Sequence, residues 1–177
     1  ESALRDCDMA AVGAERAVQA LRLLAQSAGC DGMVGGQALD LQAEESGARD
    51  GALLHETHAL KTGALIRASC GMGAILGGMD GERLSGALRY ADEIGLAFQI
   101  TDDILDETST PEEMGKSVGK DKKSGKTTYV TLYGIDRARE EAQACAGRAK
   151  AALLEMGVPR TEPFLYELAE RIVTRSH

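Results

Sequence analysis

Three aspartates stand close together in the sequence, at Asp102, Asp103 and Asp106. They follow a mostly apolar segment, residues 84–100, whose spacing predicts a helix, and on a helix residues four positions apart share a face. Carboxylates held this close repel one another unless a cation lies between them. Magnesium is usually bound by one or two carboxylates together with substrate phosphates. The sequence therefore predicts a magnesium site that handles a phosphate-containing substrate.

A solvated acidic surface is the alternative interpretation of this cluster, and acidic residues are unfavourable at the negative C-terminal end of a helix dipole unless something compensates them. The segment that follows, residues 108–127, favours the metal site because it is rich in lysine and glycine. Its lysines are Lys116, Lys120, Lys122, Lys123 and Lys126. Such a loop can be merely soluble, but next to bound metal and diphosphate its lysines would neutralise the remaining negative charge. Its glycines would let it close over the site.

The composition predicts an all-α protein with a single helical domain, residues 1–177. Hydrophobic residues make up 44% of the chain, aromatic residues only 3%, and tryptophan is absent, so the core must be built from closely packed aliphatic side chains. Three prolines leave long segments with helical periodicity, and Asp136 is expected to cap the helix that follows it. The predicted helices cover residues 14–28, 32–44, 50–77, 82–107, 128–134, 136–156 and 162–175.

Charge and cysteine usage exclude several classes of protein. The net charge of -8 argues against a nucleic-acid binder, and the sequence contains no run of about 18 apolar residues that could span a membrane. The four cysteines are scattered and form no CxxC pair. This pattern is typical of reduced thiols in a cytoplasmic protein.

Two short segments resemble known motifs but fail on spacing. Residues 119–127 resemble a nucleotide-binding P-loop, but five residues separate the glycines where four are needed, and no strand precedes them. His55 and His58 resemble part of a zinc protease motif, which needs its second histidine one position later, at Ala59. Both histidines are therefore interpreted as ordinary residues on a polar helix face.

The chain resembles the C-terminal portion of the trans-prenyl diphosphate synthases, most closely the bacterial farnesyl diphosphate synthases. The resemblance covers essentially the whole chain, with the motifs in the family's order and at its intervals. The matching segments are residues 35–41 (GGQALDL), 58–66 (HALKTGALI), 95–99 (GLAFQ), 102–106 (DDILD), 115–116 (GK) and 125–129 (GKTTY).

The resemblance implies an isoprenoid synthase-type helical bundle around a central cavity, in which two aspartate-rich motifs bind an allylic diphosphate through Mg2+. Asp102, Asp103 and Asp106 match the second of these motifs, as metal ligands. The resemblance also implies a substrate site, with Gln37 and Asp40 on a helix beneath the diphosphate. The positions implied to contact the diphosphate are Lys61, Thr62, Gln99, Lys116 and Lys126. Of these, Lys61, Thr62 and Gln99 are expected to be catalytic.

The implied reaction condenses isopentenyl diphosphate with dimethylallyl or geranyl diphosphate to give farnesyl diphosphate, in a homodimer. The first aspartate-rich motif, most of the isopentenyl diphosphate site and the residues that set product length belong upstream of Glu1, so the N-terminal helices are expected to be missing and these residues to be inactive alone. A structure is accordingly expected to show an open groove. Two alternatives remain: a geranylgeranyl or longer-chain synthase, and a non-catalytic truncated partner subunit.

Overall fold

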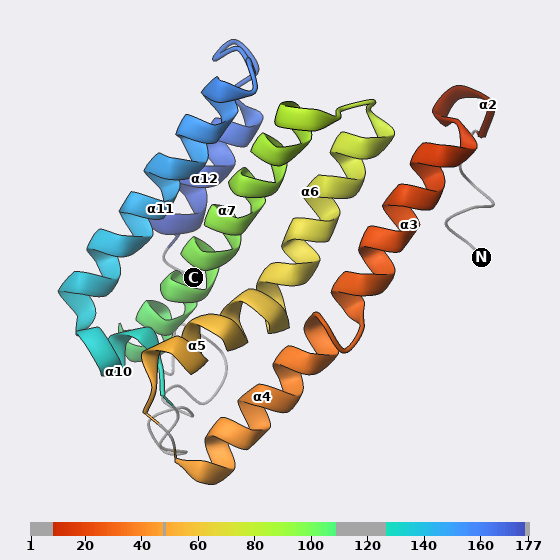
Figure 1. The fold of residues 1–177 in the computed structure, drawn as a ribbon. Helices are drawn as coiled ribbons and strands as arrows, with labels where there is room; N and C mark the ends of the chain where they lie inside the picture. The colour runs from red at the N-terminus through yellow and green to blue at the C-terminus, as the bar shows by residue number, and fades with distance from the viewer. Residues whose placement is uncertain (1–8, 48, 109–126, 176–177) are drawn as a thin grey trace.

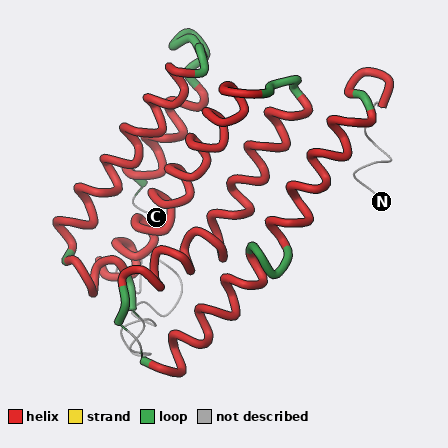
Figure 2. Tube along the Cα trace, in the orientation of Figure 1, coloured by secondary structure: helices red, strands yellow, loops and turns green. Residues whose placement is uncertain are grey.

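The computed structural model describes residues 9–47, 49–108 and 127–175, and within these residues every regular element is a helix. The prediction of an all-α protein is confirmed. Figure 2 shows short loops between neighbouring helices in the described parts of the chain. The elements are α2 (Met9–Val12), α3 (Ala14–Ala28), α4 (Met33–Ser46), α5 (Gly51–His58), the π-helical turn η1 (Ala59–Gly63), α6 (Ala64–Leu76), α7 (Gly81–Thr108), α10 (Tyr129–Tyr133), α11 (Ile135–Glu155) and α12 (Phe164–Thr174).

Four of these helices form a layer in the order α3, α6, α7 and α11, each packed against the next (Figure 1). α12 packs against both α7 and α11, while α4 and α5 meet at one end of the layer, where both contact η1. Within the described residues, no helix is both long enough and apolar enough to cross a membrane.

The boundaries of the predicted helices agree with the structure to within two residues, with three differences. The short helix α2 was not predicted. The helix expected over residues 50–77 is interrupted by η1, so that a π turn separates α5 from α6. The expected cap at Asp136 is wrong: α11 already begins at Ile135, and Gly134, with φ +82°, precedes it. Asp136 instead lies in the first turn, where its charge is favourable to the helix dipole.

The core forms two clusters that follow one another along α7, where buried side chains recur at the spacing of one helix face. Tyr90, Ile94 and Ala97 are buried along α7, and Ile100 continues them toward its end. α11 presents mainly small residues to α7, which lets the two backbones approach closely. The buried residues of α11 are Ala138, Ala142, Cys145, Ala146, Ala149, Ala152 and Leu153. This packing fixes α7, and thereby the aspartates at its C-terminal end.

Candidate functional site

Four of the predicted site residues lie on one face of α7. Gln99, Asp102, Asp103 and Asp106 are spaced i, i+3, i+4 and i+7, so they project from the same side of the helix. All four are half-buried. The apolar first part of α7 is anchored in the core, and its last two turns carry this polar face out of it.

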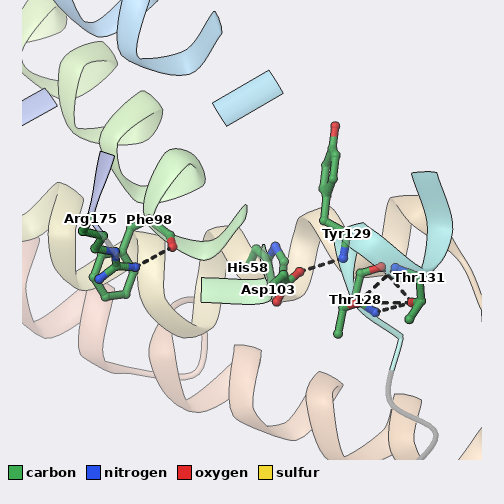
Figure 3. A network of polar contacts seen from close by, with 7 residues as sticks. All are labelled: His58, Phe98, Asp103, Thr128, Tyr129, Thr131 and Arg175. Carbon is green, nitrogen blue, oxygen red and sulfur yellow. Dashed lines mark hydrogen bonds and ion pairs between the residues drawn. The ribbon is translucent and has the colours of Figure 1, made fainter. Parts of the chain in front are cut away.

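The carboxylate of Asp102 forms an ion pair with Arg175, which follows α12. The guanidinium of Arg175 also donates a 3.1 Å hydrogen bond to the backbone oxygen of Phe98 and lies 4.2 Å from the centre of the Phe98 ring (Figure 3). Burial raises the pKa of Asp102 above its ordinary value, and the charge of Arg175 opposes that shift. The C-terminal end of α12 thus supplies a cation to the aspartate cluster.

Asp103 connects α7 to α10. Its carboxylate accepts a 2.6 Å hydrogen bond from the backbone N–H of Tyr129, and it lies 4.0 Å from Nε2 of His58 (Figure 3). Tyr129 opens α10 after Thr128, whose side chain caps that helix reciprocally with Thr131. The interpretation of His58 as a residue on a polar face is wrong, because His58 is buried against the aspartate motif. His55 is exposed, and its ring meets that of Tyr129 edge-on.

The donor set of the aspartate cluster suits magnesium, since it consists of carboxylate oxygens within two turns of one helix. Across residues 9–47, 49–108 and 127–175, no group of three or more acidic, histidine or cysteine side chains is arranged to hold a metal ion. Asp102 is turned toward Arg175, and Asp103 toward α10 and His58. Metal binding by Asp102, Asp103 and Asp106 stays a prediction.

Lys61 lies within the π turn η1. Its ammonium donates a 2.5 Å hydrogen bond to Asp40, a buried residue of α4. Single-turn π-helical insertions occur frequently at functional sites. Thr62, next to Lys61, is half-buried, whereas Gln37 of α4 is exposed.

The contacts of α5 and η1 place Lys61 in the same region as the aspartates. His58, just before η1, lies beside Asp103 of α7, and a Cβ atom built on Gly95 of α7 would lie 3.2 Å from the Cα of Gly63 at the end of η1. The turn that carries Lys61 therefore runs along α7 between Gly95 and Asp103. Two further predicted residues, Lys116 and Lys126, lie outside the described residues.

A hollow of about 310 Å³ opens between α5, η1 and α7, lined by His55, His58, Ala59, Gly63, Asp92, Glu93 and Leu96. Of the predicted substrate-binding residues that the structure describes, none lines this hollow. Its charged walls are acidic, which does not suit a diphosphate.

Sequence reasoning missed the role of two residues that contact the aspartates. Arg175 belongs to no recognisable motif. From the sequence alone, a single arginine near the end of an amphipathic helix is interpreted as an ordinary surface residue. His58 is part of the segment 58–66 that carries the resemblance, and that segment was its only signal. The contact of His58 with Asp103 arises from the antiparallel packing of the α5–η1–α6 segment on α7.

Comparison with known proteins identifies the family of the chain. Residues 4–153 match the family described as polyprenyl synthetase. The chain belongs to the polyprenyl synthetase family. It is 40% identical over 177 residues to the farnesyl diphosphate synthase of Escherichia coli, covering 99% of this chain and 59% of that protein. It is 38% identical over 169 residues to the geranylgeranyl diphosphate synthase of Cyanophora paradoxa, covering 94% and 55%.

A solved structure of this family superimposes on the chain. It is the geranyltransferase of Helicobacter pylori complexed with magnesium and isoprenyl diphosphate, with a TM-score of 0.72, 31% identity, and coverage of 90% of this chain and 52% of that one. This polyprenyl synthetase chain thus has the all-α isoprenoid synthase fold. It spans about half the length of the curated relatives it matches.

Proposed function

We propose that the intact protein is a trans-prenyltransferase that condenses isopentenyl diphosphate with dimethylallyl or geranyl diphosphate to give farnesyl diphosphate. The observation that carries this proposal is the placement of Asp102, Asp103 and Gln99 on one face of α7, beside the π turn that bears Lys61. Residues 1–177 form a single helical domain of that enzyme. The enzyme is cytoplasmic and homodimeric.

In this proposal, the chain's own residues bind and polarise the leaving diphosphate. The allylic C–O bond breaks, the diphosphate leaves with the bonding electrons, and the new C–C bond forms to isopentenyl diphosphate with loss of a proton. Lys61, Thr62 and Gln99 donate hydrogen bonds to diphosphate oxygens and so stabilise the charge that develops on them. Lys116 and Lys126 add positive charge. When bound by Asp102, Asp103 and Asp106, magnesium supplies Lewis-acid stabilisation of the same leaving group.

Two alternatives to this assignment remain. Relatives named geranylgeranyl diphosphate synthases match about as well as the farnesyl diphosphate synthase does, which favours a geranylgeranyl or longer product as the second candidate. A non-catalytic partner subunit is the third. These 177 residues hold one aspartate-rich motif where the resemblance implies two, so we propose that they need the other motif for turnover.

The test is an assay of the intact protein with isopentenyl diphosphate and each allylic diphosphate, with the products separated by chain length. We expect farnesyl diphosphate as the main product, and loss of turnover when magnesium is chelated. Asp102→Ala is expected to lower turnover by roughly 100-fold or more. Asp92→Ala, on the same helix but paired with Arg67 away from the motif, is the matched control and should stay near wild type.

Each failure of this test has its own meaning. Near-normal turnover in Asp102→Ala contradicts the assignment of the metal site. A C20 or longer product identifies the second candidate. An intact protein without turnover, which alters the rate of an added complete synthase, identifies the partner subunit.

A further inference from the structure

Two glycines, one on each neighbouring helix, allow the backbone of the π turn η1 to lie directly against the backbones of both helices. A Cβ atom built on Gly36 of α4 would lie 2.2 Å from the backbone nitrogen of Lys61, closer than real atoms approach. On the other side, a Cβ atom on Gly95 of α7 would lie 3.2 Å from the Cα of Gly63. The backbone of η1 is therefore held between α4, which it meets at Lys61, and α7, which it meets at Gly63, and no side chain of Gly36 separates Lys61 from α4.

Asp40 restrains the other end of Lys61, which is the ammonium group of its side chain. It follows Gly36 by one helical turn on α4, so both face η1. Its carboxylate, whose side chain is 10% exposed, accepts the 2.5 Å hydrogen bond from the ammonium of Lys61, whose side chain is 34% exposed. A lysine side chain free in solution samples many rotamers. Here its backbone and its charged tip are both restrained by α4.

We propose that Asp40, which the resemblance placed on a helix beneath the diphosphate, is a positioning residue that acts on the diphosphate only through Lys61 and does not contact it directly. The inference rests on the proposed role of Lys61 at the diphosphate. A buried carboxylate facing a diphosphate directly would repel it, whereas an ammonium between the two is attracted to both. An ammonium has three donor hydrogens, so one bond to Asp40 leaves two for phosphate oxygens.

The alternative is a purely structural ion pair that joins α4 to η1. Both explanations predict that loss of Asp40 changes stability, so stability does not separate them. They differ in coupling: a residue that acts through Lys61 loses its effect on diphosphate binding once Lys61 is gone, while a direct contact keeps it.

The experiment is a double-mutant cycle on the intact protein. Binding of inorganic pyrophosphate in the presence of magnesium is measured by calorimetry for wild type, Asp40→Asn, Lys61→Met and the double variant. We expect Asp40→Asn to raise the Kd about 10-fold in the wild-type background and less than about 2-fold in the Lys61→Met background. Asp40→Asn should likewise raise the KM for the allylic diphosphate more than it lowers kcat.

Glu45→Gln is the matched control, because it removes the same charge from an exposed position of α4 and should leave pyrophosphate binding unchanged. Asp40→Ser takes the place of Asp40→Asn in the cycle if the latter does not fold. Equal losses in the two backgrounds would show that Asp40 contacts the diphosphate directly, and no loss in either would show a structural pair; both overturn the inference. If Lys61→Met binds pyrophosphate as wild type does, the proposed role of Lys61 has failed instead.

Discussion

Small residues line two helix contacts in this molecule, α11 on α7 and α4 on η1, with different consequences. α11 presents a row of buried alanines, and the space they leave is filled by larger apolar side chains such as Ile100 and Leu153. α4 presents Gly36 and then the charged Asp40. In the first contact close approach buries apolar surface. In the second it fixes the position of a charged side chain, Lys61.

The two contacts should therefore differ in what they contribute to stability. Fully burying a large aliphatic side chain stabilises the fold by about 1.5–3 kcal/mol, and the α7–α11 contact contains several. The α4–η1 contact instead contains a helical glycine, which costs about 1 kcal/mol relative to alanine, and a buried ion pair, which is weak evidence for stability. Substitutions in the first contact should lower stability, and those around the site should mainly lower activity.

The largest expected effect belongs to Asp103, which is a proposed metal ligand and also attaches α10 to α7. Asp103→Asn keeps an oxygen that can accept from the backbone N–H of Tyr129, but it loses the negative charge. We expect turnover to fall by roughly 100- to 1000-fold with little change in the thermal midpoint. The measurements are steady-state kinetics and calorimetric melting of the intact protein.

Asp103→Ala is the companion variant, because it also removes the acceptor of the Tyr129 N–H. A buried donor left unsatisfied costs about 1–3 kcal/mol, so this variant should lose stability as well as turnover. If Asp103→Asn melts as early as Asp103→Ala, the charge of Asp103 supports the fold, and the contrast between the two regions does not hold at this residue.

In the apolar contact, Leu153→Ala is expected to cost about 3 kcal/mol of unfolding free energy. Leu153 is 0% exposed, so its removal leaves a cavity between α11 and α7. Leu154 is the next residue on the same helix and is 50% exposed, which makes Leu154→Ala a matched control with a small expected effect. Denaturant unfolding measures both. Equal losses would mean that the α7–α11 contact does not dominate stability.

Most helices could be predicted because each carries its own signal, whereas the four residues of α2 are too few to show a helical period. The apolar periodicity of residues 82–107 and the glycines at 77, 78 and 134 mark helices and their ends locally. The prediction that Asp136 caps α11 failed. Gly134 adopts a positive φ, and α11 begins directly after it, one residue earlier than the side-chain pattern indicates. The π turn was also missed. Its sequence is compatible with a continuous helix, and its packing between Gly36 and Gly95 involves residues that are distant in the chain.

The arrangement of the candidate site was predictable in part, while its function stays a prediction. Asp102, Asp103 and Gln99 share a face because they are close in sequence, and a helix is sufficient to place them together. The pairs Lys61–Asp40, Asp102–Arg175 and Asp103–His58 join residues far apart in the chain. Such pairs depend on how helices pack, which no local pattern encodes. The assignment of Lys61 to the site came from the resemblance, and its restraint by Asp40 came from the structure.

A smaller effect is expected for Gly36→Ala. The added Cβ would collide with the backbone of Lys61, 2.2 Å away, so α4 and η1 must separate. Overpacking of this kind costs about 1–3 kcal/mol, and the displacement of Lys61 should weaken pyrophosphate binding at the same time. Gly147→Ala, on α11, is the control: nothing lies within 4 Å of its Cβ position, so alanine should stabilise the helix by roughly 0.5–1 kcal/mol. If Gly36→Ala is equally stabilising, the two backbones are not held in contact.

An effect confined to alkaline pH, and absent at neutral pH, is a loss of stability that originates in the apolar contact. Burial, with smaller contributions from Glu93 and Glu141, raises the pKa of the Cys145 thiol from 9.0 to about 12, against the opposing charge of Arg148. Between these values the folded protein keeps a proton that the unfolded chain loses. The contribution of the thiol is therefore complete below pH 9 and declines as the pH rises toward 12, by at most about 1.4 kcal/mol per pH unit.

Cys145→Ala removes this titration while leaving a small apolar side chain in the core. Unfolding free energies measured between pH 8 and 11 should therefore fall less steeply in this variant than in wild type. Cys30→Ala, at an exposed position of the loop before α4, should leave the slope unchanged. A common slope in all three proteins would mean that Cys145 ionises as readily in the fold as outside it, and that the α7–α11 contact admits water.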